Sequence, residues 1–79
     1  MQDQDFKEMA YEPITEAWKI IHMTQHLGPD DTEKWEKFVK AHDSFCEKYD
    51  YGSNKSYGYY LGMAIMAVVD EIAKENLRE

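Results

Sequence analysis

The sequence predicts an all-α protein, a small antiparallel bundle of three main helices with a short N-terminal helix. Three observations predict this fold class. The stretch from Tyr57 to Val69 carries no charge, and its small and unbranched side chains favour helix. Apolar residues between Trp35 and Tyr49 recur at helical spacing. Nowhere do β-branched and polar residues alternate over the length of a strand.

The length of the chain and its apolar content predict a single helical domain over residues 1–79. Seventy-nine residues are near the size at which one hydrophobic core is only just sufficient. Hydrophobic residues make up 43% of the chain and aromatic residues 14%, which is ample for a packed core. Disorder over the whole chain is therefore not expected.

The first two expected helices cover about residues 3–11 and 13–27. Pro13 separates them, because proline lacks an N–H and disfavours helical geometry at the residue before it. Proline is well suited to the first turn of a new helix. A single helix kinked at Pro13 is the alternative. The side chains of the second helix expected in the core are Ile14, Ala17, Trp18, Ile20, Ile21 and Leu27.

The third expected helix, about residues 31–50, has the clearest periodicity. Gly28 and Pro29 end the preceding helix, and Asp30 with Glu33 has the pattern of a capping box. Charged residues occupy the other sides of this helix. The apolar stripe expected in the core consists of Trp35, Phe38, Val39, His42, Phe45, Cys46 and Tyr49.

The last expected helix, about residues 55–77, follows a loop around Gly52. Gly58 and Gly62 border its apolar stripe, and each interior glycine costs about 1 kcal/mol of helix propensity relative to alanine. We therefore expect a neighbouring helix or an aromatic ring to approach these glycines closely. The stripe consists of Leu61, Ile65, Val68, Val69 and Ile72.

This last helix has more apolar surface than two neighbouring helices can cover. One explanation is that the N-terminal segment covers the remainder through Phe6, Met9 and Tyr11. The other is an interface with a partner or with a second copy of the chain, because exposed tyrosine and methionine side chains are typical of binding surfaces. The residues expected at such an interface are Tyr59, Tyr60 and Met63.

Negative charge is concentrated near the N-terminus. The formal net charge is −7, and residues 1–16 contain five acidic residues against one lysine. This charge argues against direct binding to nucleic acid and to anionic membranes. A partner recruited by charge is expected to be a basic protein. Four acidic residues, at spacings of 3, 4 and 4, are expected on one helical face: Asp5, Glu8, Glu12 and Glu16.

Histidine and carboxylate patterns leave a metal site as an alternative. His22 and His26 have the i,i+4 spacing of metal ligands on a helix. The order of a histidine, then His42 and Asp43, then Asp70 resembles the order of ligands in HD-type metal phosphohydrolases. This resemblance implies a small metal-dependent hydrolase. We nevertheless expect ordinary core or surface histidines, with no metal and no cofactor.

Two acidic pairs form a further pattern. Glu33-x-x-Glu36 and Glu47-x-x-Asp50 resemble the motifs of all-helical nucleotide pyrophosphatases, which use such clusters to bind magnesium. Both pairs lie on one continuous predicted helix here, so they could not converge within one chain. Glu33 and Glu36 also have lysines four residues later, which is typical of a solvated face.

Cys46 is the only cysteine, so no internal disulfide is possible and a reducing compartment is expected. It lies on the buried stripe of the third helix, where a thiol is usually inert, and His42 is its only candidate base. The acidic N-terminal residues lack the apolar stretch of a signal peptide. We therefore expect a cytoplasmic protein.

Together these patterns predict a protein that is not an enzyme but a protein-interaction module. It would contact a basic partner through Asp5, Glu8, Glu12, Glu16, Tyr59, Tyr60 and Met63. One form of this function is an inhibitor or regulator of a nucleic-acid-handling protein, as phage and mobile-element inhibitors are. The first alternative is a structural homo-oligomer, such as a homodimer, built on the Tyr/Met face of the last helix. The second is the small metal-dependent hydrolase.

Overall fold

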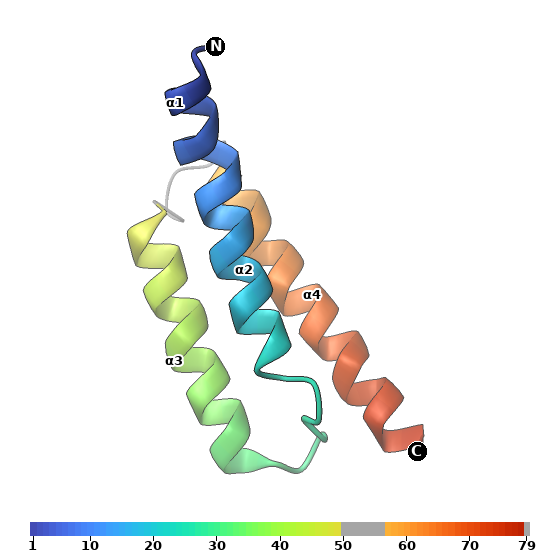
Figure 1. Ribbon diagram of the computed structural model, residues 1–79. Helices are drawn as coiled ribbons and strands as arrows, with labels where there is room; N and C mark the ends of the chain where they lie inside the picture. The colour runs from blue at the N-terminus through green and yellow to red at the C-terminus, as the bar shows by residue number, and fades with distance from the viewer. Residues whose placement is uncertain (50–56, 79) are drawn as a thin grey trace.

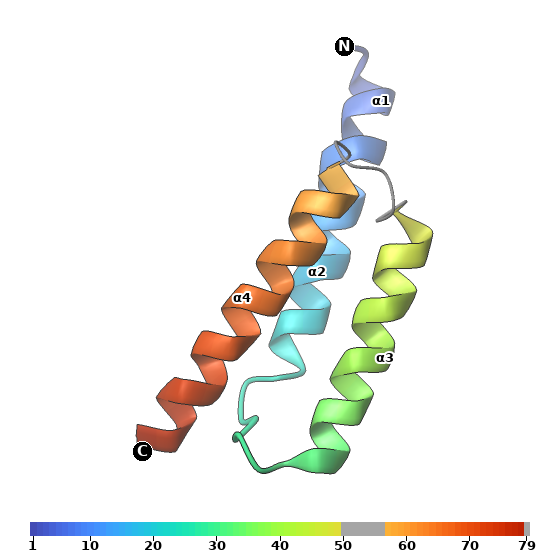
Figure 2. The same ribbon diagram turned by 180° about the vertical axis from the view of Figure 1, so that it is seen from behind.

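The computed structural model describes residues 1–49 and 57–78, and every regular element within these ranges is a helix (Figure 1). In chain order the elements are α1 (Asp3–Phe6), the π-helical segment η1 (Lys7–Tyr11), α2 (Glu12–His22), α3 (Thr32–Lys48) and α4 (Tyr57–Arg78). Helices α2 and α4 run in one direction and α3 runs in the other (Figures 1 and 2). The predicted all-α fold class is confirmed. The loop expected around Gly52 lies outside the described residues.

Elements α1, η1 and α2 form one continuous rod, so the break expected at Pro13 is absent (Figure 1). The backbone stays right-handed helical across both junctions, at Lys7 and at Glu12. Pro13 cannot donate a hydrogen bond to the carbonyl of Met9, and in a regular α-helix its ring would clash with that carbonyl. The wider π turn immediately before Pro13 absorbs this defect without ending the helix.

Helix α2 ends at His22 and not near residue 27 as expected. Residues 23–26 form turns in which the Thr24 N–H and hydroxyl both donate to the Ile21 carbonyl, at 3.0 and 2.7 Å. The side-chain amide of Asn76, on α4, donates to the carbonyls of Gln25 (3.1 Å) and Leu27 (2.7 Å). These bonds pair carbonyls in the turns just after α2 with a side chain of α4.

The expected capping box at Asp30 and Glu33 is not formed. Asp31 is the residue before α3, and its carboxylate accepts no hydrogen bond from the first turn of that helix. It accepts one from the Gly28 N–H, at 2.8 Å. The indole N–H of Trp35 donates to the Gly28 carbonyl at 3.0 Å. The turn before α3 is therefore held by hydrogen bonds to both the N–H and the carbonyl of Gly28.

The hydrophobic core lies where α2, α3 and α4 meet. In α3, Phe38 and Phe45 are fully buried and His42 is nearly so, as its periodicity predicts. The side chains of Trp35, Cys46 and Tyr49 are half-buried around them, whereas Val39 is exposed. The buried cluster consists of Ala17, Ile20, Leu27, Phe38, Phe45, Ile65 and Val69.

Two bulky residues of α2 that were expected in the core are exposed. Ile14 is 54% exposed and Trp18 is 61% exposed. The buried stripe of α2 is formed by Pro13, Ala17 and Ile20, which are spaced by four and three residues. Ile14 and Trp18 each follow a member of this stripe by one residue, which places them about 100° around the helix. They therefore lie beside the core and not within it.

The N-terminal extension, defined here as Asp3–Tyr11, projects beyond the ends of α3 and α4 (Figure 1). Neither α1 nor η1 contains a buried residue. The explanation that this segment covers α4 is therefore wrong, because its three large apolar side chains face solvent: Phe6, Met9 and Tyr11. Much of the apolar surface of α4 is left exposed by the residues that the structure describes.

Candidate protein-interaction surfaces

The four acidic residues predicted to bind a partner fall into two environments. Asp5, Glu8 and Glu12 are exposed, the first two on the N-terminal extension and the third directly after it. Glu16 lies on α2, where its carboxylate accepts a hydrogen bond from the Lys48 ammonium at 3.2 Å. This hydrogen bond and the charge of Glu16 raise the pKa of Lys48. Glu16 therefore joins α2 to α3, and the other three carboxylates face solvent.

The N-terminal extension combines negative charge with exposed aromatic rings. Phe6 is 59% exposed and Tyr11 is 66% exposed, and both lie among the acidic residues. Glu8 accepts a hydrogen bond from the side chain of Gln4, one turn earlier, at 3.1 Å. A helical surface of this kind offers carboxylates for charge pairing and aromatic rings for apolar contact.

The three residues predicted on α4 lie on a different surface. Tyr60 is 58% exposed, and its ring packs edge-on against that of half-buried Tyr59, with centroids 5.4 Å apart. Met63, 51% exposed, lines a hollow of about 490 Å³ between α3 and α4. The other residues that line this hollow are His42, Gly62, Met66, Ala67 and Asp70. The predicted set is thus divided between the N-terminal rod and α4.

His42 connects α3 to α4 at Gly62, one of the two glycines at which a close contact was expected. Its Nε2 atom donates to the Gly62 carbonyl at 2.8 Å, and its side chain is buried. One helical turn before Gly62, a Cβ atom on Gly58 would overlap the carbonyl oxygen of Tyr49. The expectation that a neighbouring element approaches these glycines closely is confirmed at Gly58, where α3 ends against the start of α4.

This arrangement bears on the alternative of a metal site. His42 and Asp70 line the same hollow, but the bond to Gly62 occupies the His42 Nε2 atom. His22 stacks on Trp18, with ring centroids 5.5 Å apart. Within residues 1–49 and 57–78, no group of three or more His, Cys, Asp or Glu side chains is arranged to hold a metal ion.

Cys46 has the environment of a structural thiol. Its Sγ atom lies 3.8 Å from Nδ1 of His42 and is half-buried. Burial and, to a smaller extent, the negative charge of Asp43 raise the pKa of this thiol. A raised pKa disfavours the thiolate, which is the nucleophilic form, so this environment does not activate Cys46.

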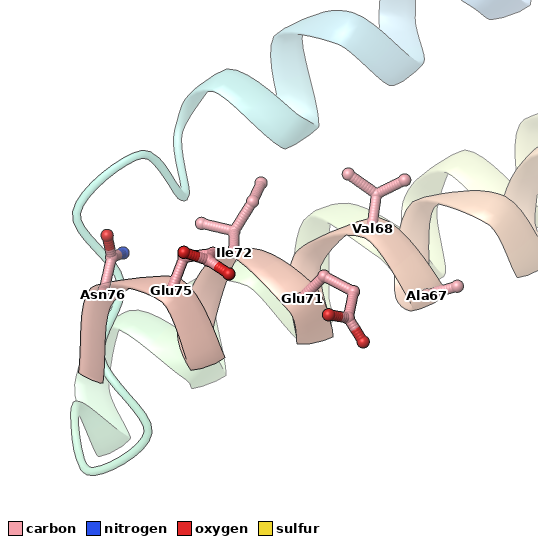
Figure 3. Close-up of a pocket in the computed structure, with 6 residues that line it drawn as sticks. All are labelled: Ala67, Val68, Glu71, Ile72, Glu75 and Asn76. Carbon is pink, nitrogen blue, oxygen red and sulfur yellow. The ribbon is translucent and has the colours of Figure 1, made fainter. Parts of the chain in front are cut away.

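A further apolar surface lies between α2 and α4, and it was not expected because its residues were assigned to the core. Ile14 and Trp18 face solvent on α2, and Val68 is 42% exposed on α4. Figure 3 shows that the side chains of Val68 and Ile72 point toward α2. These two side chains line a hollow of about 440 Å³ on α4. A sequence signal for this surface exists: Pro13, Ala17, Ile20, Thr24 and Leu27 form an alternative stripe at helical spacing.

Comparison with protein-family models, with curated proteins and with solved structures finds no significant match to this chain. Across the two described ranges, none of the helices has the length and apolar character needed to cross a bilayer.

Proposed function

We propose that this protein is a non-catalytic protein-interaction module that binds a basic protein. The observation that carries the proposal is the N-terminal extension, whose helical turns project from the bundle with carboxylates and aromatic rings exposed together. Charge recruits the partner at long range, and Phe6 and Tyr11 supply the apolar contact area. An inhibitor or regulator of a nucleic-acid-handling protein is the form that fits a basic partner best.

The total surface of the chain also supports an interaction function. Its accessible surface is 5924 Å², whereas a monomeric protein of 9.4 kDa has about 5,000 Å². The radius of gyration is 13.6 Å, against about 11.6 Å for a compact domain of this length. The chain is elongated, with extents of 45 × 21 × 17 Å, and so offers more surface for contacts than a compact domain of the same mass does.

A homo-oligomer is a second candidate function, favoured by one observation. Tyr60, Met63 and Met66 are all exposed on α4, and such residues are enriched at interfaces. Two chains that each carry a net charge of −7 repel one another, however, which opposes self-association. Sedimentation equilibrium at high micromolar concentration separates the candidates, because a monomer at that concentration contradicts the homo-oligomer.

The test of the proposed function begins with capture of partners from native cells on the tagged full chain. Affinity for each captured protein is then measured with the variant D5N/E8Q/E12Q. The matched control is E33Q/E36Q/E47Q, which removes three exposed charges from α3 instead. We expect the first variant to lose about tenfold in affinity and the control less than threefold.

Salt provides the second arm of this test. Raising the salt concentration from about 50 mM to about 500 mM screens exposed charges, so binding by the original chain should weaken. Equal losses in the two triple variants, or an affinity that salt does not change, would contradict docking through the N-terminal extension. Circular dichroism of each variant shows whether its helices are intact.

A further inference from the structure

The α2–α4 face is defined here as Ile14 and Trp18 on α2 with Val68 and Ile72 on α4. Three of these side chains are between 42% and 61% exposed, and Ile72 is half-buried. Directly beside them, Ala17, Ile65 and Val69 are buried in the core. The face is therefore an apolar surface that continues outward from the core, and it differs from a set of scattered exposed residues.

The two halves of the face are carried by two neighbouring helices. Helices α2 and α4 are parallel neighbours, and Asn76 bonds to the carbonyl of Gln25 (Figures 1 and 2). Val68 precedes Asn76 by eight residues, which is about 12 Å along a helix. Trp18 lies one turn before the end of α2 at His22, and the turns of residues 23–26 follow. Val68 and Trp18 therefore both lie on the N-terminal side of the contact between Asn76 and Gln25.

Helix α4 diverges from α2 toward its C-terminal end (Figures 1 and 2). The divergence leaves the flank of α4 at Val68 and Ile72 uncovered, and the hollow of about 440 Å³ is located there (Figure 3). On each helix the two apolar residues are one turn apart, so each pair forms an apolar stripe that follows its helix axis. Apolar stripes on two neighbouring helices offer a surface on which the apolar ridge of a third helix can pack.

The charges beside the hollow on α4 select the kind of helix. Glu71 and Glu75 line the hollow together with Val68 and Ile72. Lys74 pairs with Glu71 at 3.4 Å, but both side chains are more than half exposed, so this pair is weak and is easily exchanged. A second copy of the chain would bring a further net charge of −7 to the acidic edge. Charge complementarity therefore favours a basic occupant.

We infer that the α2–α4 face binds an amphipathic helix of the partner, with its apolar ridge against Trp18 and Val68 and its lysines or arginines beside Glu71 and Glu75. This inference rests on the proposed function, because the helix belongs to the same basic protein that the N-terminal extension attracts. Burial of an exposed tryptophan at the centre of such a contact is typical of a binding hot spot. The helix would extend the core and cover part of the excess surface.

The probe for this inference is an amidated peptide of about 14 residues made of leucine and lysine, with its leucines on one helical face. The comparison peptide has the same composition in an order that gives no apolar face. Binding is followed by nuclear magnetic resonance of the two indole N–H groups. We expect the Trp18 signal to move and the Trp35 signal, whose N–H donates to Gly28, to stay.

Matched variants on α4 locate the binding surface. Val68→Glu and Met63→Glu place the same charge on exposed positions of one helix, on the α2 side and in the α3–α4 hollow respectively. We expect Val68→Glu to weaken peptide binding at least tenfold and Met63→Glu less than threefold. The variant E71Q/E75Q keeps the apolar face intact and should weaken binding severalfold, so the test does not depend on one substitution.

Several outcomes would overturn the inference. Equal binding of the two peptides would show attraction by charge alone, and equal losses in the two α4 variants would show that the α2–α4 face is not the site. Loss of peptide binding in D5N/E8Q/E12Q but not in Val68→Glu would place the helix on the N-terminal extension, which overturns this inference and leaves the proposed function standing. The proposed function fails separately, when captured partners bind both triple-charge variants equally.

Discussion

Helices α2 and α3 use their apolar residues in opposite ways. In α3 the bulkiest side chains face the core, where Phe38 is 0% exposed and Phe45 is 2% exposed. In α2 the small side chain of Ala17 faces the core and the large ring of Trp18 is 61% exposed. Helix α3 therefore supplies the two aromatic rings of the buried cluster, while α2 supplies smaller side chains and leaves its largest ring exposed to solvent. A large aromatic side chain on an amphipathic helix can therefore face the core, as Phe38 does, or face solvent, as Trp18 does.

The largest expected effect tests this contrast directly. Phe38→Ala removes a fully buried ring and should lower the free energy of unfolding by about 3–5 kcal/mol, enough to unfold much of so small a domain. Trp18→Ala, an equally drastic truncation at an exposed position, should change it by less than about 1 kcal/mol. Urea denaturation followed by circular dichroism measures both. Equal losses would contradict the different roles of α2 and α3.

The next prediction concerns the contact between the end of α3 and the start of α4. Gly58→Ala should lower the free energy of unfolding by about 1–3 kcal/mol, because the new Cβ atom would overlap the Tyr49 carbonyl. Helix propensity alone predicts the opposite sign, a gain of about 1 kcal/mol. Thermal unfolding therefore distinguishes the two by sign, and a stabilised variant would show that this approach is not close.

Cys46 gives a smaller effect that reports the environment inside α3. Because its pKa is raised, the folded thiol should react with iodoacetamide severalfold more slowly near neutral pH than the urea-unfolded chain does. Its reaction rate should keep rising at a pH at which the unfolded thiol is already fully ionised. Asp43→Asn removes the negative charge that contributes to the shift, and should speed the reaction modestly. A rate unaffected by folding would contradict this description.

The smallest expected effect is that of the Glu16–Lys48 pair, which joins α2 to α3. Both side chains are at least 40% exposed, so Glu16→Gln should lower the free energy of unfolding by less than about 1 kcal/mol. The difference should shrink at about 500 mM salt, where exposed charges are screened. Glu12→Gln, one turn earlier, serves as the control, because no lysine within residues 1–49 and 57–78 pairs with its carboxylate. A loss that salt does not reduce would indicate a role other than charge pairing.

Several features of the fold could be predicted because they depend on local spacing. The core positions of α3 were correct at Phe38, His42 and Phe45, since charged residues occupy its other sides and leave one possible orientation. The need for a close neighbour at Gly58 was also predictable, because an interior glycine has a known cost in a helix. On the candidate surfaces, the acidic residues of the N-terminal extension are exposed to solvent, as their charge predicts.

Other features depended on contacts between distant segments. Helix α2 has apolar residues on two adjacent faces, and their spacing does not show which face meets α3 and α4. The end of α2 at His22 is supported by hydrogen bonds from Asn76 to carbonyls about 50 residues earlier in the sequence, which no local pattern reveals.

The sequence by itself therefore determined the helical class, the orientation of α3 and the acidity of the N-terminal rod, because each follows from residues within a few turns of one another. Only the tertiary structure decided that Trp18 faces solvent, that the N-terminal extension leaves α4 uncovered, and that Val68 and Ile72 line an apolar hollow on α4. The physical reason is that packing selects among apolar faces by the shape of the neighbouring helices, and that shape is not encoded within any single helix.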